Sequence, residues 1–509
     1  MFENQPKALY ALALANTGER FGYYTMIAVF SLFLRANFGL SGNTAGLIYG
    51  VFLALVYFLP LVGGIMADKF GYGKMVTIGI IVMFAGYLFL SIPLGGGVMG
   101  YAAMFGALLL VSLGTGLFKG NLQVMVGNLY DAPELSAKRD SGFSIFYMAI
   151  NIGALFAPTA AVRIKEWAEH SLGYSGNDAY HFSFAVACVS LIVSMMIYYA
   201  FRSTFRHVEA GAGKSKKTDT TVATEELTPQ QTKERIVALC LVFAVVIFFW
   251  MSFHQNGLTL TFFADEFVNP KSEGVQTMAF DVINLVMIIF MIYSIMSFFQ
   301  SKTSKAKLIS TVVFLAAVGV LVYKYHNIGG PVDVSAPIFQ QFNPFYVVAL
   351  TPVSMAIFGA LAAKGKEPTA PRKIAYGMII AGSAYLLMVL ASRGLLTPNE
   401  QTAAKAAGET VPFASGNWLI GTYLILTFGE LLLSPMGISF VSKVAPPKYK
   451  GTMMGGWFVA TAIGNLLVSV GGFLWNDIPL TIVWSVFIVL CLLSAGFMFL
   501  MMKRLEKVA

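Results

Sequence analysis

The sequence predicts an all-α membrane protein, and three observations lead to that class. Of the 509 residues, 57% are hydrophobic and 12% are charged, and the mean hydropathy is +0.72. Soluble domains are about 45–50% apolar and about 25% charged, so this composition excludes soluble enzymes, nucleic-acid-binding proteins and secreted modules. Fourteen mostly apolar runs follow one another, and Lys and Arg concentrate in alternate loops between them.

The apolar runs give the predicted transmembrane helices in order. A helix needs about 20 mostly apolar residues to cross a bilayer. The first run contains Glu19 and Arg20 and is too long for a cleavable signal sequence, so we expect it to remain as a helix. The predicted helices cover residues 8–34, 43–66, 75–94, 99–129, 142–162, 182–201, 236–264, 278–299, 307–323, 343–363, 374–392, 417–442, 452–474 and 480–502.

The distribution of positive charge orients these helices. If the N-terminus is cytoplasmic, 25 of the 34 Lys and Arg residues lie in loops on that side and 7 on the opposite side, with Arg20 and Lys119 inside helices. Cytoplasmic loops of membrane proteins carry such an excess of positive charge. We therefore predict that both termini are cytoplasmic, and that the net charge of +9 reflects topology and not nucleic-acid binding.

The longest polar segment divides the chain. Residues 202–235 are rich in Lys, Thr, Glu and Gly, which predicts a flexible cytoplasmic linker. Residues 1–201 before it are predicted to form an N-terminal six-helix bundle. After it we expect the first helix of a C-terminal bundle (236–277), an accessory helix pair (278–325) and the remainder of that bundle (326–509).

Five polar residues of the first run share one helix face. Asn16, Glu19, Arg20, Tyr23 and Tyr24 are spaced as neighbours on such a face. An ionisable side chain at bilayer depth costs at least about 2.5–3.5 kcal/mol, so such residues usually line a cavity. Pairing of Glu19 with Arg20 would lower this cost for both.

Three more ionisable residues lie well inside predicted helices: Lys119, His254 and Glu430. Asp281 lies only at the start of its run, at the expected membrane interface, so it is set apart. Lys119 could join Glu19 and Arg20 in a purely structural cluster, but the cost of buried charge favours a cavity-lining role in coupling. Glu430 has no charged neighbour within one turn of its helix, which favours binding of a proton or a cationic ligand. His254 either titrates or is a packed core residue.

Eight motifs stand in a characteristic order along almost the whole chain. They are Glu-Arg-Phe-Gly-Tyr-Tyr (19–24), Gly-Gly-Ile-Met-Ala-Asp-Lys-Phe-Gly (63–71), Gly-Thr-Gly-Leu-Phe-Lys-Gly-Asn (114–121), Phe-Tyr-Met-Ala-Ile-Asn-Ile-Gly (146–153), Phe-Trp through Gln (249–255), Gln-Phe-Asn-Pro (341–344), Gly-Glu-Leu-Leu-Leu-Ser-Pro (429–435), and Trp457 with Gly-Asn (464–465). Together they resemble the proton-dependent oligopeptide transporters, the POT or peptide transporter family of the major facilitator superfamily.

The resemblance implies a major facilitator fold, in which two six-helix bundles rock about a central site; the accessory pair brings the spans to fourteen. It also implies proton-coupled uptake of di- and tripeptides through the bacterial inner membrane, without a metal or cofactor. The expected partners are the peptide, protons and the lipid bilayer, and we expect a monomer.

The resemblance assigns roles to individual residues. Glu430 would hold the peptide amino terminus, Lys119 the carboxylate, and Asn151 and Asn343 the peptide backbone. The other residues expected to bind substrate are Tyr23, Tyr24, Tyr57, Tyr147, Trp250, Gln255, Ser434 and Trp457. The residues expected to couple protons are Glu19, Arg20, Lys119 and His254.

The chain departs from the family pattern in four places. Asn16 replaces the leading acid of the first-helix motif, and Ile27 replaces a basic residue that would contact the substrate carboxylate. His254 replaces the acid before Gln255. The extra helix pair (278–325) follows the seventh helix, whereas related bacterial chains often place it between the sixth and seventh.

These departures leave three coupling mechanisms open. Glu19 could exchange a proton while Lys119 alternates between Glu19 and the substrate carboxylate, which is our hypothesis. His254 could titrate instead. The third possibility is passive equilibration of the substrate without protons.

Three other classes of function compete with peptide transport. An intramembrane enzyme would need a metal cluster or a nucleophile with its base, and the sequence offers no such motif. A carrier of another small solute, such as nitrate, would use the same fold, but a charged Glu430 would repel an anion. A passive channel fits poorly with glycines such as Gly63 and Gly114, which suit close-packed moving helices.

Overall fold

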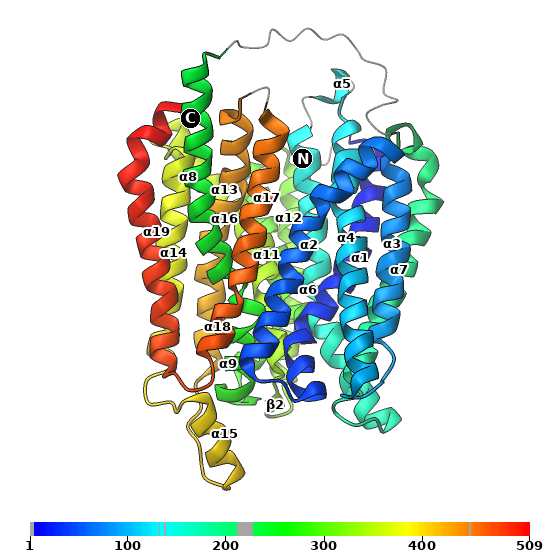
Figure 1. The fold of residues 1–509 in the computed structure, drawn as a ribbon, viewed down its shortest axis with the longest axis vertical. Coiled ribbons are helices and arrows are strands. Elements are labelled where there is room, and N and C mark those ends of the chain that lie inside the picture. The colour runs from blue at the N-terminus through cyan, green and yellow to red at the C-terminus, as the bar shows by residue number, and fades with distance from the viewer. Residues whose placement is uncertain (1–4, 132, 137–138, 211–226, 447–448, 509) are drawn as a thin grey trace.

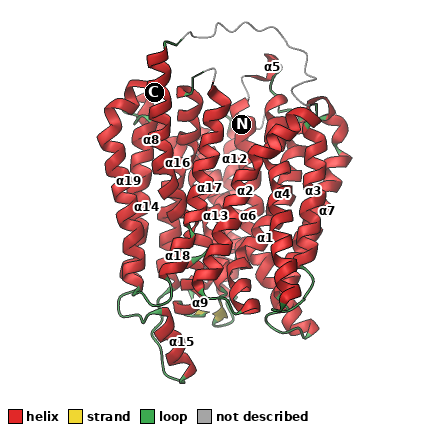
Figure 2. Cartoon of the chain, viewed as in Figure 1, coloured by secondary structure: helices red, strands yellow, loops and turns green. Residues whose placement is uncertain are grey.

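The structure is a computed structural model that describes residues 5–131, 133–136, 139–210, 227–446 and 449–508. Long helices stand side by side in one bundle, and the loops lie at its two ends (Figure 2). The two ends of the chain lie at the same end of this bundle (Figure 1), as an even number of crossings requires.

The described residues of the first half form seven helices and two short 3-10 helices. They are α1 (Lys7–Phe38), α2 (Gly42–Phe70), α3 (Tyr72–Leu90), α4 (Val98–Asn128), α5 (Pro133–Ser136), α6 (Arg139–Leu172), α7 (Tyr180–Ala200), η1 (Arg202–Thr204) and η2 (Arg206–Val208). We refer to residues 5–210 as the N-terminal half.

In the second half, the described residues 227–446 and 449–508 form helices and two short antiparallel strands joined by loops. Its elements are α8 (Pro229–Phe253), η4 (His254–Gly257), α9 (Thr259–Phe267), β1 (Lys271–Ser272), α10 (Val275–Ala279), α11 (Val282–Gln300), α12 (Ser304–His326), β2 (Val332–Asp333), η5 (Ala336–Gln341), α13 (Phe342–Ala363), α14 (Ala370–Ala391), α15 (Pro398–Ala406), α16 (Gly416–Val444), α17 (Lys450–Leu467), α18 (Ser469–Leu474) and α19 (Leu480–Val508). We refer to it as the C-terminal half.

Thirteen spans in the described part of the chain are long and apolar enough to cross a membrane. The predicted count of fourteen differs because α1 is absent from this set. Helix α1 has 32 residues, about 48 Å of helix, and is long enough to cross. It carries Asn16, Glu19 and Arg20 in its middle, and these polar side chains lower its hydropathy.

Two helix boundaries differ from the predicted ones. Helix α8 begins at Pro229, inside the predicted linker, because Thr228 and Gln231 form a capping box: Thr228 Oγ1 accepts from the Gln231 N–H, and Gln231 Oε1 accepts from the Thr228 N–H. The predicted helix 236–264 is interrupted by η4. Hydropathy detects neither feature, since capping side chains set the start of a helix and an apolar run can contain a break.

The start of the predicted linker is ordered against the N-terminal half. The Glu209 carboxylate accepts hydrogen bonds from Arg202 at 2.8 Å and from the hydroxyl of Tyr198 at 2.9 Å. The Glu209 carbonyl accepts from the Gly73 N–H at the start of α3. Hydrogen bonding to Glu209 raises the pKa of Arg202 above its ordinary value. These contacts attach the start of the predicted linker to α3 and α7.

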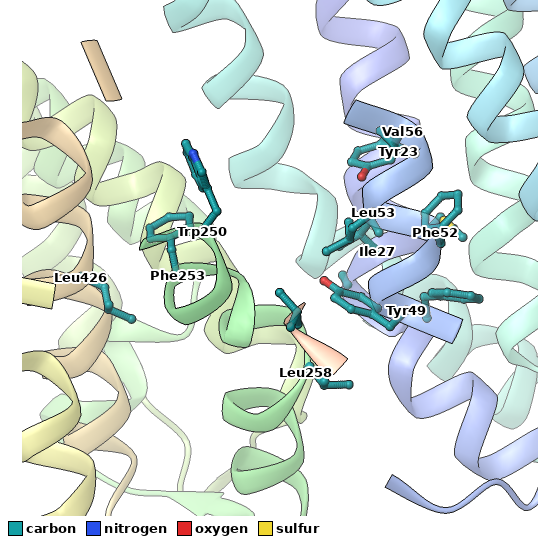
Figure 3. Packing of buried hydrophobic residues seen from close by; sticks show 14 of the residues in the cluster. Tyr23, Ile27, Tyr49, Phe52, Leu53, Val56, Trp250, Phe253, Leu258 and Leu426 are labelled. Carbon is teal, nitrogen blue, oxygen red and sulfur yellow. The ribbon is translucent and has the colours of Figure 1, made fainter. Parts of the chain in front are cut away.

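The two halves meet along two seams: α2 packs against α17 and α18, and α6 packs against η5 and α13. A Cβ atom on Gly50 would lie 2.8 Å from the Leu466 carbonyl oxygen, and one on Gly46 would lie 3.0 Å from Gly472 Cα. Small residues permit this close approach of the two helices. Figure 3 shows Tyr49 of α2 pointing from this seam toward the segment at Leu258.

The accessory helices α11 and α12 pack against each other, and α11 also packs against α13. The side chains of α12 are mostly exposed, with Leu308 65% and Leu315 61% accessible, as expected for a helix that faces lipid. Asp281 accepts a hydrogen bond from the Ile283 N–H at the start of α11 and forms an ion pair with Lys324 at the end of α12.

Candidate functional site

The polar face of α1 contains a closed ion pair. Arg20 donates from Nε and Nη2 to the two carboxylate oxygens of Glu19, both at 2.5 Å. Glu19 is fully buried, Arg20 is 3% exposed, and the guanidinium carbon lies 4.6 Å from the centroid of the Tyr23 ring. The two charges neutralise each other within one helix.

Lys119 of α4 lies over an aromatic ring. Its Nζ is 4.0 Å from the centroid of the Tyr57 ring on α2, a cation–π contact. Within the described residues Lys119 forms no salt bridge. Because Glu19 is bonded to Arg20, the predicted contact between Lys119 and Glu19 is not made in this arrangement.

Glu430 of α16 is the buried acid of the C-terminal half. It is 8% exposed and accepts a hydrogen bond from Asn343 Nδ2 at 2.9 Å. The same amide donates to Thr427 Oγ1 at 3.0 Å, one turn before Glu430. Asn343 stands at the start of α13, directly after η5. Where the structure describes the chain, Glu430 has amide and hydroxyl groups around it and no ion-pair partner.

His254 stands in η4, where α8 is interrupted. Its Nδ1 lies 2.6 Å from Asn465 Oδ1, and its ring stacks on Trp250 with centroids 5.1 Å apart. The His254 ring also lies 6.1 Å, centroid to centroid, from the Tyr57 ring of the other half. Tyr57 therefore lies beside both Lys119 and His254.

Several predicted substrate residues are packed inside the protein. Gln255 is fully buried: its amide donates to the Met251 and Val468 carbonyls, and its Oε1 accepts from Thr259. This hydrogen bonding joins the break between α8 and α9 to that between α17 and α18. Trp457 is 3% exposed and its ring lies on Gly437, where a Cβ would be 1.9 Å from Cη2.

Tyr23 is also packed: it is 4% exposed and lies between Arg20 and Phe52. Trp250 is also mostly buried, at 8% exposed, and its Nε1 has no hydrogen-bond partner among the described residues. The substrate roles of these packed residues stay predictions, and the contacts given above show what each side chain does structurally.

Tyr24, Tyr57, Tyr147 and Ser434 are more accessible, whereas Asn151 is buried at 7% exposed. Tyr147 of α6 is 45% exposed, and its carbonyl accepts from the Asn151 amide one turn later. Tyr24 packs edge-on against Tyr23, and Ser434 is half-buried one turn beyond Glu430.

The sequence did not reveal the polar contacts that join the two halves. Arg35 at the end of α1 forms an ion pair with Glu266 of α9, 231 residues away. Gln340 of η5 donates to the Ala28 carbonyl, and Thr159 of α6 donates to Gln341 Oε1. The sequence indicates this ion pair only in that Arg35 and Glu266 carry opposite charges and follow the C-terminal ends of two predicted helices.

The chain is similar to known membrane transporters over nearly its whole length. A sequence profile described as the POT family (PTR2) matches residues 73–225 and 324–483. Dipeptide and tripeptide permease B of Xenorhabdus bovienii is 26% identical over 480 residues, covering 92% of this chain and 86% of the relative. A di-/tripeptide transporter of Lactococcus lactis subsp. cremoris is 29% identical over 497 residues, covering 92% and 89%.

Solved structures share the fold. The crystal structure of a peptide transporter POT in complex with sulfate superposes with a TM-score of 0.73 at 22% identity, covering all of this chain and 96% of the other. The predicted all-α transporter fold is thereby confirmed. Since the profile match covers more than half of the residues, this chain belongs to the POT family, as a multi-pass protein of the bacterial inner membrane.

Proposed function

We propose that this protein takes up di- and tripeptides by alternating access, driven by the proton gradient. The observation that carries the proposal is a separated pair of opposite charges. Glu430 in the C-terminal half and Lys119 in the N-terminal half each lack an ion-pair partner among the described residues. A peptide zwitterion supplies an ammonium for one and a carboxylate for the other. Several relatives are named as dipeptide and tripeptide carriers, which supports the same substrate class.

The polar neighbours of each charge fit this assignment. Asn343 holds the Glu430 carboxylate with its amide N–H, and its carbonyl oxygen, which has no hydrogen bond among the described residues, can accept from a peptide N–H. Asn151 is expected to meet the peptide backbone from α6. Contacts limited to the termini and backbone leave the substrate side chains weakly specified, so a broad range of short peptides follows.

The remaining substrate contacts are proposed in two groups. Tyr24, Tyr57, Tyr147 and Ser434 contact the peptide side chains directly. Tyr23, Trp250, Gln255 and Trp457, which are packed, shape the site from behind.

The transport cycle is proposed to use the two halves as rigid units. One unit is the N-terminal bundle, residues 1–201, and the other consists of the helices of 236–277 and 326–509. The two units rock about the seam of α2 with α17 and α18, and the linker 202–235 joins them. The accessory pair 278–325 moves with α13, on which it packs. Both termini face the cytoplasm, as the charge bias predicts. One chain is the transport unit, because Glu430 and Lys119 come from the same chain, and the peptide leaves chemically unchanged.

Proton coupling is proposed to involve Glu19, Arg20, Lys119 and His254. In this arrangement Glu19 is bonded twice to Arg20, while Lys119 lies over Tyr57. The groups with unused hydrogen-bonding capacity are therefore Lys119 and His254, and the Glu19–Arg20 pair supports them.

Uptake of labelled di-alanine into proteoliposomes tests this function. Wild type and Glu430→Gln are compared with and without an inward proton gradient, and Asp281→Asn serves as a charge-removal control outside the site. We expect gradient-dependent accumulation in wild type and the control, and its loss in Glu430→Gln.

Two results would contradict parts of the proposal. If di-alanine only equilibrates across the membrane, with or without the proton gradient, proton coupling is refuted and peptide transport stands. Absence of uptake would refute peptide transport and favour the alternative function, a carrier of another small solute such as nitrate. Lys119 and His254, which lie beside Tyr57, favour that alternative because a cationic group attracts an anion. The buried carboxylate of Glu430 opposes it because it repels one.

A further inference from the structure

We infer that Lys302, Lys305 and Lys307 bind the phosphate headgroup of an anionic phospholipid, whose acyl chains lie along the exposed face of α12. These lysines stand where α11 ends and α12 begins, at the end of the bundle that holds the chain termini. The inference goes beyond the proposed transport function, because it gives the accessory helix pair a ligand of its own.

The positive charge of this junction is not balanced by the protein. All three lysine side chains are exposed, and none forms a salt bridge with a described residue. Residues 282–332 contain no Asp or Glu, and Asp281 pairs with Lys324 at the opposite end of the helix pair. Lys305 and Lys307 also stand in the first turn of α12, where the helix dipole opposes a cation. An anion held here would offset both sources of positive potential.

An apolar face of α12 begins directly beside these charges. Leu308, Val312 and Leu315 are spaced as neighbours on one side of the helix, and they are 65%, 57% and 61% exposed. Lys305 precedes Leu308 by one turn on the same side. Helix α12 is also the least buried of the thirteen spans in the described part of the chain. A phospholipid has the matching form, with a charged end followed by apolar chains.

Two contacts between α11 and α12 hold the junction in place. The Ser310 hydroxyl donates to Ser297 Oγ at 3.0 Å, and Lys307 Nζ lies 5.6 Å from the centroid of the Phe298 ring. Lysines near the end of a membrane helix keep their stems along apolar surface and extend the ammonium to the headgroup layer. The three charges are therefore expected at the depth of lipid phosphates.

A second copy of this chain is the other partner that fits an exposed membrane helix, and the lysines oppose it. Two copies inserted in the same direction would bring these lysines together at one depth, where like charges repel. An anionic headgroup is attracted instead, and each lysine near the membrane surface raises the affinity for anionic lipid about fivefold.

Native mass spectrometry of the full chain in detergent tests the site. The probes are dioleoylphosphatidylglycerol, which is anionic, and dioleoylphosphatidylcholine, which is zwitterionic. In wild type we expect one phosphatidylglycerol to bind in preference to phosphatidylcholine. Glycerol phosphate, which carries the headgroup phosphate without acyl chains, should not displace it.

The triple variant Lys302→Gln, Lys305→Gln, Lys307→Gln should bind phosphatidylglycerol about 10- to 100-fold more weakly, because three attractive charges are lost. Its binding of phosphatidylcholine should not change. If this variant does not fold, Lys305→Gln alone should weaken phosphatidylglycerol binding about fivefold.

A matched control removes the same charge elsewhere at this end of the bundle. Lys233, Lys503 and Arg504 are exposed at the start of α8 and the end of α19, and their replacement by Gln should leave phosphatidylglycerol binding unchanged. An equal loss in the control, or wild-type binding in a folded lysine variant, would overturn the inference. Displacement by glycerol phosphate would overturn the lipid assignment in favour of a free phosphate. A complex of two chains that disappears in the triple variant would overturn it in favour of a second copy. None of these measurements depends on transport.

Discussion

Glu19 and Glu430 are both carboxylates buried at membrane depth, but their neighbours differ. Glu19 receives two hydrogen bonds of 2.5 Å from the guanidinium of Arg20, its neighbour in sequence. Glu430 receives one hydrogen bond, from the neutral amide of Asn343, which comes from another helix. The first site contains its own counter-charge, and the second does not.

This difference separates a structural charge from a binding charge. A buried carboxylate that is already neutralised has nothing to gain from a ligand, and its removal leaves the partner exposed to a low dielectric. A buried carboxylate with only dipolar neighbours is incompletely compensated, and a cationic group of a ligand or a proton completes it. The comparison predicts that mutation of Glu19 affects stability first and that mutation of Glu430 affects transport first.

The largest effect is expected for Glu19→Gln. This change leaves the Arg20 guanidinium buried without its counter-charge, which typically destabilises a protein by about 3–5 kcal/mol. We expect a lower thermal midpoint in detergent. The double variant Glu19→Gln with Arg20→Met should recover most of that loss, since it removes both charges. A single variant that melts like wild type but loses its response to the proton gradient would show that Glu19 carries the proton, and the comparison would fail.

Glu430→Gln should have the next largest effect, and it should act on transport. Glutamine still accepts a hydrogen bond from Asn343 but offers no charge to the peptide ammonium. Losing one member of a buried charge pair costs about 2 kcal/mol or more, so we expect uptake of di-alanine to fall at least about 30-fold. The thermal midpoint should stay close to that of wild type. Uptake at the wild-type rate would mean that the open carboxylate is not the ammonium site.

The sequence predicted the helices more fully than their ends. Apolar runs and charge bias depend on local composition, so the order of the membrane helices and the common side of the two termini could be read directly. The start of α8 and the interruptions at η4 and between α17 and α18 depend on side chains such as Thr228 and Gln255, whose effect comes from single hydrogen bonds.

The site was predictable in its charges and not in its pairings. Lys119, His254 and Glu430 stand out because an ionisable group in an apolar run is rare. Which group neutralises which depends on packing between segments far apart in sequence. The sequence allowed Glu19 to pair with Arg20 or to exchange with Lys119, and the structure shows the first. The hydrogen bond of His254 to Asn465 spans 211 residues, and nothing local indicates it.

A smaller effect is expected when a side chain is added to a glycine in the seam between the halves. Helix α2 offers one glycine in tight contact with the other half and one glycine with open space around it. A Cβ on Gly50 would lie 2.8 Å from the Leu466 carbonyl oxygen, whereas one on Gly64 would have no atom within 4 Å. Gly50→Ala should therefore destabilise the protein by about 1–3 kcal/mol and slow uptake, because α2 must move away from α17. Gly64→Ala should change neither the thermal midpoint nor uptake. Equal behaviour of the two variants would show that the seam is not tightly packed during transport.

The smallest effect is expected at the ion pair of the accessory helices, which completes the comparison. Asp281 and Lys324 are 40% and 30% exposed, whereas Glu19 and Arg20 are buried. Exposed ion pairs contribute about 0–1 kcal/mol because solvent screens them. Asparagine also keeps the hydrogen bond that Asp281 accepts from the Ile283 N–H, so Asp281→Asn preserves the start of α11. We expect uptake within about twofold of wild type and a nearly unchanged thermal midpoint. A loss as large as that of Glu19→Gln would show that charge removal itself, and not burial of the remaining partner, determines stability in this fold.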